Sequence, residues 1–188
     1  TALIGSMRIG GSGDDGVNIR PNYTRPQVSE STRRNYGDDA RSEVIVDGAG
    51  NIILASATQS NDFKVSAGAF QLTAGAKTAT RLQDGVVIKM TPNLDAVIFS
   101  SYLGGNDDDA AFVLAINPLT GFIYVAGATA STDFPGSKAG VLFGTNQGNI
   151  DGFVTIISPD GTRQIATSYF GTSGADIIYG IQFDKYGF

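Results

Sequence analysis

The sequence predicts an all-β fold, namely a β-propeller with four-stranded antiparallel blades that is incomplete in this chain. Three observations predict it: a long segment recurs along the chain, each copy holds four short strand-like runs, and tight-turn residues separate the runs. The composition agrees, because 25 residues are Gly and only 16% are charged. Such a composition is typical of short strands joined by tight turns and not of long helices.

The repeat is visible as two interleaved matches at nearly the same spacing. Residues 84–109 recur 67 residues later as residues 151–176. Residues 37–63 match residues 107–134 at an offset of 70, which becomes 71 after one inserted residue. Two interleaved matches at nearly the same offset are hard to obtain by chance, so they indicate a repeating structural unit.

Each copy contains four runs rich in Val, Ile, Phe or Tyr, as expected for strands. In the two copies these runs are residues 42–46 and 112–116, 51–57 and 122–128, 85–90 and 152–157, and 96–102 and 164–169. The turns between them combine Gly, Pro, Asn and Asp, which tight hairpins require. Four antiparallel strands per repeat describe a propeller blade. The period exceeds the roughly 40–50 residues usual for a blade, and the excess lies between the second and third runs.

The repeat register divides the chain into five parts. We expect the last strand of a preceding blade and its handover loop, an inserted loop, two whole blades and the start of a further blade. These are residues 1–15, 16–36, 37–105, 106–172 and 173–188. A ring of six to eight such blades needs roughly 400–540 residues, so we expect two whole and two partial blades here.

The repeat resembles the SBBP repeats, which are β-propeller repeats of bacterial surface proteins. The resemblance is carried by Tyr-Leu-Gly-Gly at 102–105, three Asp at 107–109, Ser-Thr-Asp-Phe-Pro at 131–135 and Asp-Gly-Phe-Val at 151–154. It covers residues 37–188 and also residues 9–15. It implies a module of a large secreted or cell-surface protein, similar to those of Bacteroidetes that type IX secretion exports.

Two residue types that dominate catalytic and zinc sites are missing. The sequence has no His and no Cys, which excludes Ser-His and Cys-His nucleophile pairs and His/Cys zinc sites within this chain. The net charge of −5 argues against nucleic-acid binding, which needs a basic surface. No apolar run reaches the ~18 residues that a membrane-spanning helix needs. We therefore expect a protein that is not an enzyme, binds no nucleic acid and does not insert in a membrane.

Clustered Asp residues stand where one blade passes to the next. They are Asp14, Asp15, Asp38, Asp39, Asp107, Asp108 and Asp109. Carboxylates are the hard oxygen ligands that calcium prefers, so a calcium site is one interpretation. The other is that these side chains accept hydrogen bonds from backbone amides in turns. The second is favoured, because the spacing of an EF-hand is absent. We therefore expect no cofactor other than this candidate calcium.

The segment 16–36 interrupts the repeat and is rich in Arg in an otherwise acidic chain. Its candidate binding residues are Arg20, Tyr23, Arg25, Arg33 and Arg34. Arg and Tyr are favoured at interfaces, and insertions in propellers fall in loops on one face. One interpretation is a site for a protein or glycan at the cell surface, and the other is a solvated loop without a partner.

Two further predictions concern packing. Phe63 and Phe134, which follow Asp in the loop after the second run of each copy, are expected to plug the hydrophobic layer of their blade. Equivalent strand positions should supply the core. Those positions are Ile45, Ile53, Val87, Ile98, Val113, Tyr124, Val154 and Ile165.

Two functions fit these observations. The first is a non-catalytic structural and interaction module, extracellular or on the outer cell surface, that displays loops for adhesion and packs against the remaining blades of its parent chain. The second is a lectin-like propeller that binds carbohydrate, with or without calcium, through its recurring Asp and aromatic loops. The absence of Trp weighs against the second, since aromatic faces commonly bind sugars.

Overall fold

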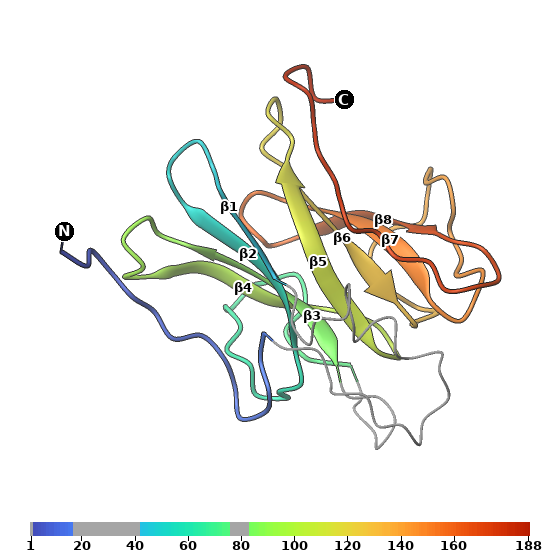
Figure 1. The fold of residues 1–188 in the computed structure, drawn as a ribbon, viewed down its shortest axis with the longest axis horizontal. Coiled ribbons are helices and arrows are strands. Elements are labelled where there is room, and N and C mark those ends of the chain that lie inside the picture. Colours follow the sequence, from blue (N-terminus) through green and yellow to red (C-terminus); the bar gives the residue numbers. More distant parts are fainter. Residues whose placement is uncertain (1, 17–41, 76–82) are drawn as a thin grey trace.

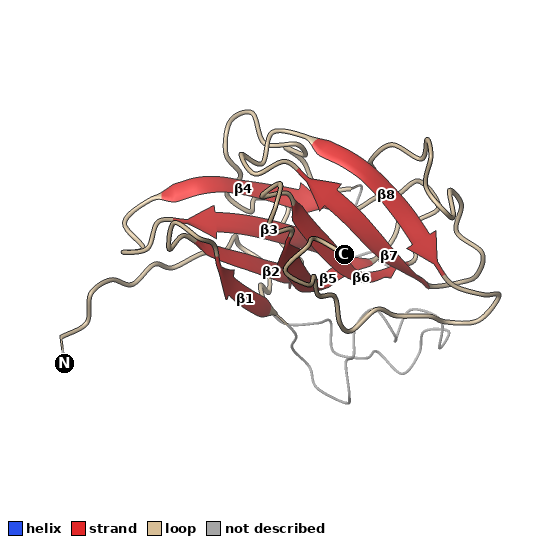
Figure 2. Cartoon of the chain, turned by 90° about the horizontal axis from the view of Figure 1, so that it is seen from above, coloured by secondary structure: helices blue, strands red, loops and turns tan. Residues whose placement is uncertain are grey.

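A computed structural model describes residues 2–16, 42–75 and 83–188. These residues form an all-β structure of two four-stranded antiparallel sheets, and no helix occurs among them. The two sheets stack face to face (Figures 1 and 2). The described part of the chain forms this stack and no closed ring.

Both sheets have the same simple topology, in which each strand pairs with the next strand along the chain. The first sheet holds β1 (Glu43–Val46), β2 (Ile52–Thr58), β3 (Asp84–Met90) and β4 (Val97–Leu103). The second holds β5 (Asp109–Ile116), β6 (Ile123–Thr129), β7 (Asp151–Ile157) and β8 (Gln164–Phe170). All eight strands overlap the runs predicted from the sequence, so the four-strand repeat is confirmed.

The largest hydrophobic cluster lies between the sheets. The first sheet contributes side chains such as Ile53, Val87 and Phe99, and the second contributes side chains such as Phe153 and Tyr169. Burial of this apolar surface holds the two sheets together.

The predicted core positions are confirmed in part. Ile53, Val87 and Val113 are buried and four others are partly buried, but Ile98 is 42% exposed. Side chains alternate across a strand, so burying Phe99 against the second sheet directs Ile98 to the opposite face. On that opposite face, Ile98 belongs to no buried hydrophobic cluster.

The outward face of the first sheet carries the same apolar positions as the face of the second sheet that packs against the first. On the first sheet, Phe63, Val86, Met90 and Tyr102 form a cluster that residues 7 and 9 help to cover. The repeat register makes these four residues equivalent to Phe134, Phe153, Ile157 and Tyr169, which face the first sheet in the central cluster. Each sheet therefore has two apolar faces, which are two complementary stacking surfaces.

The start of a third repeat is recognisable in the last residues of the chain. Ile178 and Ile181, equivalent to Ala111 and Leu114 of β5, pack on the outward face of the second sheet. Asp184 accepts hydrogen bonds from Tyr186 N and Phe188 N and so begins a tight turn. In Figure 1 this segment, drawn in red, crosses the second sheet.

Residues 2–9, predicted as the last strand of a preceding blade, form no strand in this structure. A strand satisfies its backbone groups by pairing, and within the described residues this segment pairs with no neighbouring strand. The segment is nevertheless in contact with the first sheet, because Met7 and Ile9 pack against its outward cluster.

The long loops between second and third strands run along the outer edge of each sheet. In the first sheet, Ser66 N donates to Ser100 O at 2.9 Å and Tyr102 N donates to Gln71 O at 3.3 Å. In the second, Thr167 N donates to Ser137 O and Tyr169 N to Phe143 O, both at 3.0 Å. The residues that lengthen this repeat therefore pair with the backbone of β4 and β8, which would otherwise be open edges.

Candidate functional site

A turn closed by a single carboxylate occurs before the first sheet, between the two sheets and after the second sheet. Asp109 Oδ2 accepts a hydrogen bond from Gly105 N at 2.7 Å. Asp15 Oδ2 accepts one from Gly11 N at 2.8 Å, and Asp176 Oδ2 one from Thr172 N at 2.7 Å. The donor lies four residues before the acceptor in all three cases. We call each of these turns, at residues 11–15, 105–109 and 172–176, a junction turn.

A loop of the following sheet contacts the junction turn from the other side. In the second repeat, Asp107 N donates to Ser131 Oγ at 2.8 Å and Asn106 N donates to Asp133 Oδ1 at 2.7 Å. Ser131 Oγ in turn donates to Asp109 Oδ2 at 2.8 Å. The first repeat has the same contacts from Ser60 and Asp62 to residues 12, 13 and 15. The Asp of each Asp-Phe loop is therefore occupied by a backbone amide.

A buried tyrosine ties the same loop to the fourth strand. Tyr169 Oη accepts from Phe134 N at 3.0 Å and donates to Ser131 O at 3.3 Å. Tyr102 makes the equivalent contacts with Phe63 N and Ser60 O. Burial is the main cause that raises the pKa of Tyr169 to about 12. Both phenols keep their protons and act as paired donor and acceptor.

Phe63 and Phe134 are both buried, as the sequence predicted. Phe134 packs against Phe153 of β7 with ring centroids 4.3 Å apart. The Asp-Phe loops are thus part of the core, and their aromatic rings are not available to stack on a ligand.

Two carboxyl groups meet at the junction between the described sheets. Asp84, at the start of β3, and Asp109, at the start of β5, are both fully buried. A Cβ added to Gly104 would stand 2.3 Å from Asp84 Oδ1 and 2.8 Å from Asp109 Oδ2. Glycine at this position leaves the space that the two carboxyl groups fill.

Burial raises the pKa of Asp109 well above its ordinary value, and the neighbouring charge of Asp84 adds to the rise. Burial also raises the pKa of Asp151, which is the equivalent of Asp84 in the second repeat, and Asp176 contributes. Removing a carboxylate from water disfavours its charged form, and a second carboxylate does the same. The junction therefore holds a proton more tightly than an exposed Asp would.

Lys138 lies in the long loop that follows Phe134. Burial lowers the pKa of Lys138 to about 8. Its Nζ donates to Phe134 O at 2.8 Å and lies 4.9 Å from the centroid of the Tyr169 ring. These contacts tie Lys138 to the loop after Phe134 and to the ring of Tyr169.

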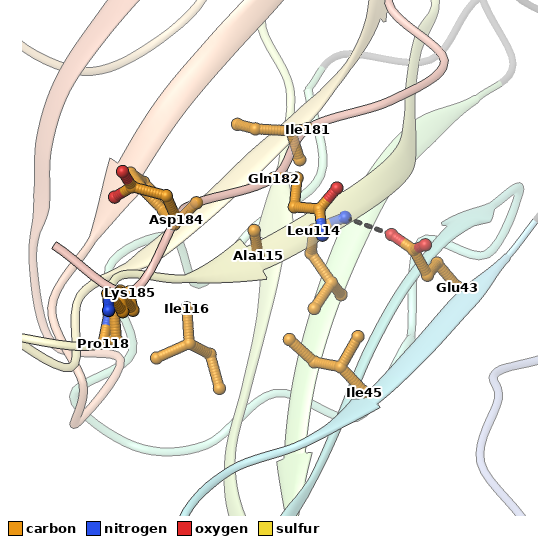
Figure 3. Close-up of a pocket in the computed structure, with 11 residues that line it drawn as sticks. Glu43, Ile45, Leu114, Ala115, Ile116, Pro118, Ile181, Gln182, Asp184 and Lys185 are labelled. Carbon is orange, nitrogen blue, oxygen red and sulfur yellow. Dashed lines mark hydrogen bonds between the residues drawn. The ribbon is translucent and has the colours of Figure 1, made fainter. Parts of the chain in front are cut away.

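A cavity of about 490 Å³ lies between the first strand of each sheet and the last residues of the chain. Its walls come from β1, from β5 with Pro118, and from residues 181–185 (Figure 3). Glu43 Oε2 accepts a hydrogen bond from Leu114 N at 2.5 Å across the cavity wall. Gln182, Asp184 and Lys185 supply the other polar groups. The carboxylate of Glu43 links the inner edges of two neighbouring sheets.

The structure treats the predicted site residues in three ways. The five candidate binding residues Arg20, Tyr23, Arg25, Arg33 and Arg34, and also Asp38 and Asp39, lie outside the described residues. Asp14 and Asp107 are exposed, and Asp108 is buried and accepts from Gln83 N at 3.1 Å. Asp15 and Asp109 close their junction turns, so the predicted role as acceptors for backbone amides is confirmed for Asp15, Asp108 and Asp109.

The described acids do not converge as calcium ligands. Across residues 2–16, 42–75 and 83–188, no group of three or more His, Cys, Asp or Glu side chains is placed to hold a metal ion. Calcium commonly takes six to eight oxygen ligands. The calcium interpretation therefore receives no support from this part of the chain.

A calcium titration of the chain by calorimetry is therefore expected to give no heat in the micromolar range. Asp108 Oδ1 accepts a hydrogen bond from Gln83 N and Asp109 Oδ2 accepts one from Gly105 N, and a cation would have to displace both. A micromolar signal that disappears in Asp108→Ala but persists in Asp95→Ala, a change in an exposed turn, would contradict this.

Sequence reasoning missed the serine and tyrosine partners of the junction turn. Ser60 and Ser131 are 71 residues apart, and Tyr102 and Tyr169 are 67 apart, which are the offsets of the repeat. Their recurrence was visible, but the contacts join residues 22 to 45 positions apart, and only the fold brings them together.

Comparison with known proteins adds no relative. A scan against protein-family models gave no match, and a search of curated proteins found no similar sequence. Within the described residues, no helix is long and apolar enough to cross a membrane.

Proposed function

We propose that this chain is a non-catalytic structural and interaction module of a large secreted or cell-surface bacterial protein, built as consecutive blades of a β-propeller of the SBBP type. The observation that carries the proposal is the stacking pattern. Ile178 and Ile181 pack on the second sheet as their equivalents in β5 pack on the first. A further repeat continuing from these residues would cover the apolar face that remains.

The chemistry of the junctions supports a structural role. The carboxylates that recur in every repeat are used within the fold, where they accept hydrogen bonds from backbone amides and serine. A binding role then falls to parts that differ between repeats. The segment 16–36, with Arg20, Tyr23, Arg25, Arg33 and Arg34, is the most distinctive of these, and a protein or glycan at the cell surface is the partner we propose.

The test compares charge reversals in the whole chain. Arg20→Glu combined with Arg25→Glu is expected to leave the unfolding midpoint unchanged and to abolish binding to an acidic glycan or protein surface. Arg163→Glu, an exposed change in the turn between β7 and β8, is the matched control and should retain binding. Salt should weaken the contact, since exposed charges are screened. Equal binding by both variants would reject segment 16–36 as the interaction site.

The second candidate function is carbohydrate binding, with or without calcium. The observation that favours it is the cavity lined by Glu43, Gln182, Asp184 and Lys185 beside apolar side chains, since ligand sites combine a few polar groups with apolar walls. A glycan array probed with and without calcium separates the two functions. Binding that is lost in Gln182→Ala but kept in Arg20→Glu/Arg25→Glu would favour the lectin-like function over the interaction module.

A further inference from the structure

The same pair of positions is in contact at two places, once between the two sheets and once between residues 2–9 and the first sheet. Between the two described sheets, the ring of Phe99 in β4 lies against Gly161, in the turn between β7 and β8. A Cβ added to Gly161 would stand 2.2 Å from Phe99 Cγ. Gly161 also has a φ of +69°, which L side chains rarely adopt. The large side chain is on the strand, and the turn has none.

The contact before it uses the same positions with the sizes exchanged. Residues 9–15 align with residues 103–109, which makes Gly5 the equivalent of Phe99. Leu94 is the equivalent of Gly161, and both close the same turn, with N–H bonds to Thr91 O at 3.0 Å and to Ser158 O at 2.9 Å. A Cβ added to Gly5 would stand 1.8 Å from Asn93 O and 3.5 Å from Leu94 Cβ. Here the turn carries the large side chain, and the segment of residues 2–9 has none at this position.

Leu94 occupies its turn position in a backbone conformation that residues with a side chain rarely adopt. Its φ of 58° is the only positive value among the described non-glycine residues. Its side chain packs on the outward cluster of the first sheet with Met7 and Ile9. Glycine would fit the backbone better, so the side chain is retained for what it contacts.

We infer that the pair of positions Phe99–Gly161, and its equivalent Gly5–Leu94, determines which repeats can stack, through the sizes of the two side chains. At one contact the bulky side chain is Phe99 of β4 and at the other it is Leu94 of the turn, so a face of one kind does not fit the neighbour of the other. A face with Phe99 would meet Leu94 in steric conflict, and a face with Gly5 would leave a void over Gly161. The inference goes beyond the proposed function, since it concerns how repeats select one another whatever the module binds.

The first test places a side chain in the turn of the intact chain. Gly161→Leu is expected to lower the equilibrium constant for folding at least tenfold more than Gly140→Leu, measured by urea unfolding. Gly140 is the matched control, because its φ of +73° imposes the same strain while no atom lies within 4 Å of an added Cβ. Equal losses in the two variants would mean that backbone strain alone explains the glycine, and would overturn the inference.

The second test exchanges the sizes. Phe99→Gly combined with Gly161→Leu recreates the Gly5–Leu94 arrangement at the later contact. The double variant should be at least tenfold more stable than the product of the two single losses predicts. If Gly161→Leu alone does not fold, recovery of a folded chain on adding Phe99→Gly supports the inference, and failure to recover it overturns the inference.

Discussion

Replacing Phe134 by Ala is expected to destabilise the chain by about 3–5 kcal/mol, which is the usual cost of removing a buried aromatic ring. Phe134 is fully buried and packs against Phe153 in the cluster that joins the two sheets. The cavity would open at the sheet interface, and the loop that closes the junction turn would lose its anchor. Chemical unfolding followed by circular dichroism measures the loss.

Phe143→Ala is the matched control, because Phe143 lies in the same long loop and is 44% exposed. Its removal should cost about 1 kcal/mol or less. Similar losses for Phe134→Ala and Phe143→Ala would show that the loop does not plug the core, and the assignment of Phe134 would be wrong.

The second large effect is a fall in stability with rising pH that depends on Asp109. Burial, with the charge of Asp84, raises the pKa of Asp109 in the folded state well above its ordinary value of 3.8. Between the unfolded and folded pKa values the folded chain binds a proton that the unfolded chain has lost. The free energy of unfolding therefore decreases as pH rises through that window, by about 1.4 kcal/mol per pH unit.

Asp109→Asn removes the titration while keeping a side-chain oxygen for Gly105 N. The parent should therefore be favoured over the variant most at acidic pH, and this advantage should shrink as pH rises above 4. Unfolding free energies measured from pH 4 to pH 9 follow the difference. Parallel profiles for parent and variant would contradict the predicted protonation of Asp109.

Asp160→Asn supplies a control of opposite sign. Hydrogen bonds, first that from Ser158 Oγ, lower the pKa of Asp160 to about 2. Its stabilising contribution is present above the unfolded pKa of 3.8 and is lost as pH falls towards the folded pKa of about 2, so this control is measured from pH 2 to pH 7. The two variants should thus differ from the parent at opposite ends of the pH range.

The sequence predicted the strands well because each one is encoded locally and twice. Alternation and turn residues mark β2 and β6 in the same register, and the observed bounds differ from the expected ones by one residue. The exception is β5, which begins at Asp109, three residues before the predicted start. The predicted run began at Phe112, whereas the backbone already pairs at Asp109 with Thr129 and at Ala110 with Ala128.

The contacts within the junction could not be predicted in the same way. Asp109 was expected to accept amide hydrogen bonds, but its burial beside Asp84 follows from how two sheets meet across Gly104. Glu43 shows the same limit, since its partner Leu114 N is 71 residues away. Such distances in sequence carry no local pattern, and only the stacked fold defines them.

The strip of loop along β4 and β8 determines how a protein of this kind can lengthen. A sheet can be extended sideways by another strand or face to face by another sheet, and residues such as Ser66 and Ser137 already occupy the sideways position. On the side of β4 and β8, addition of a further sheet face to face is the route that remains open. Duplication of one unit of about 70 residues would therefore insert between two neighbours without creating a new lateral surface. Evolution can change the number of units in such a protein while every outer rim stays as it was.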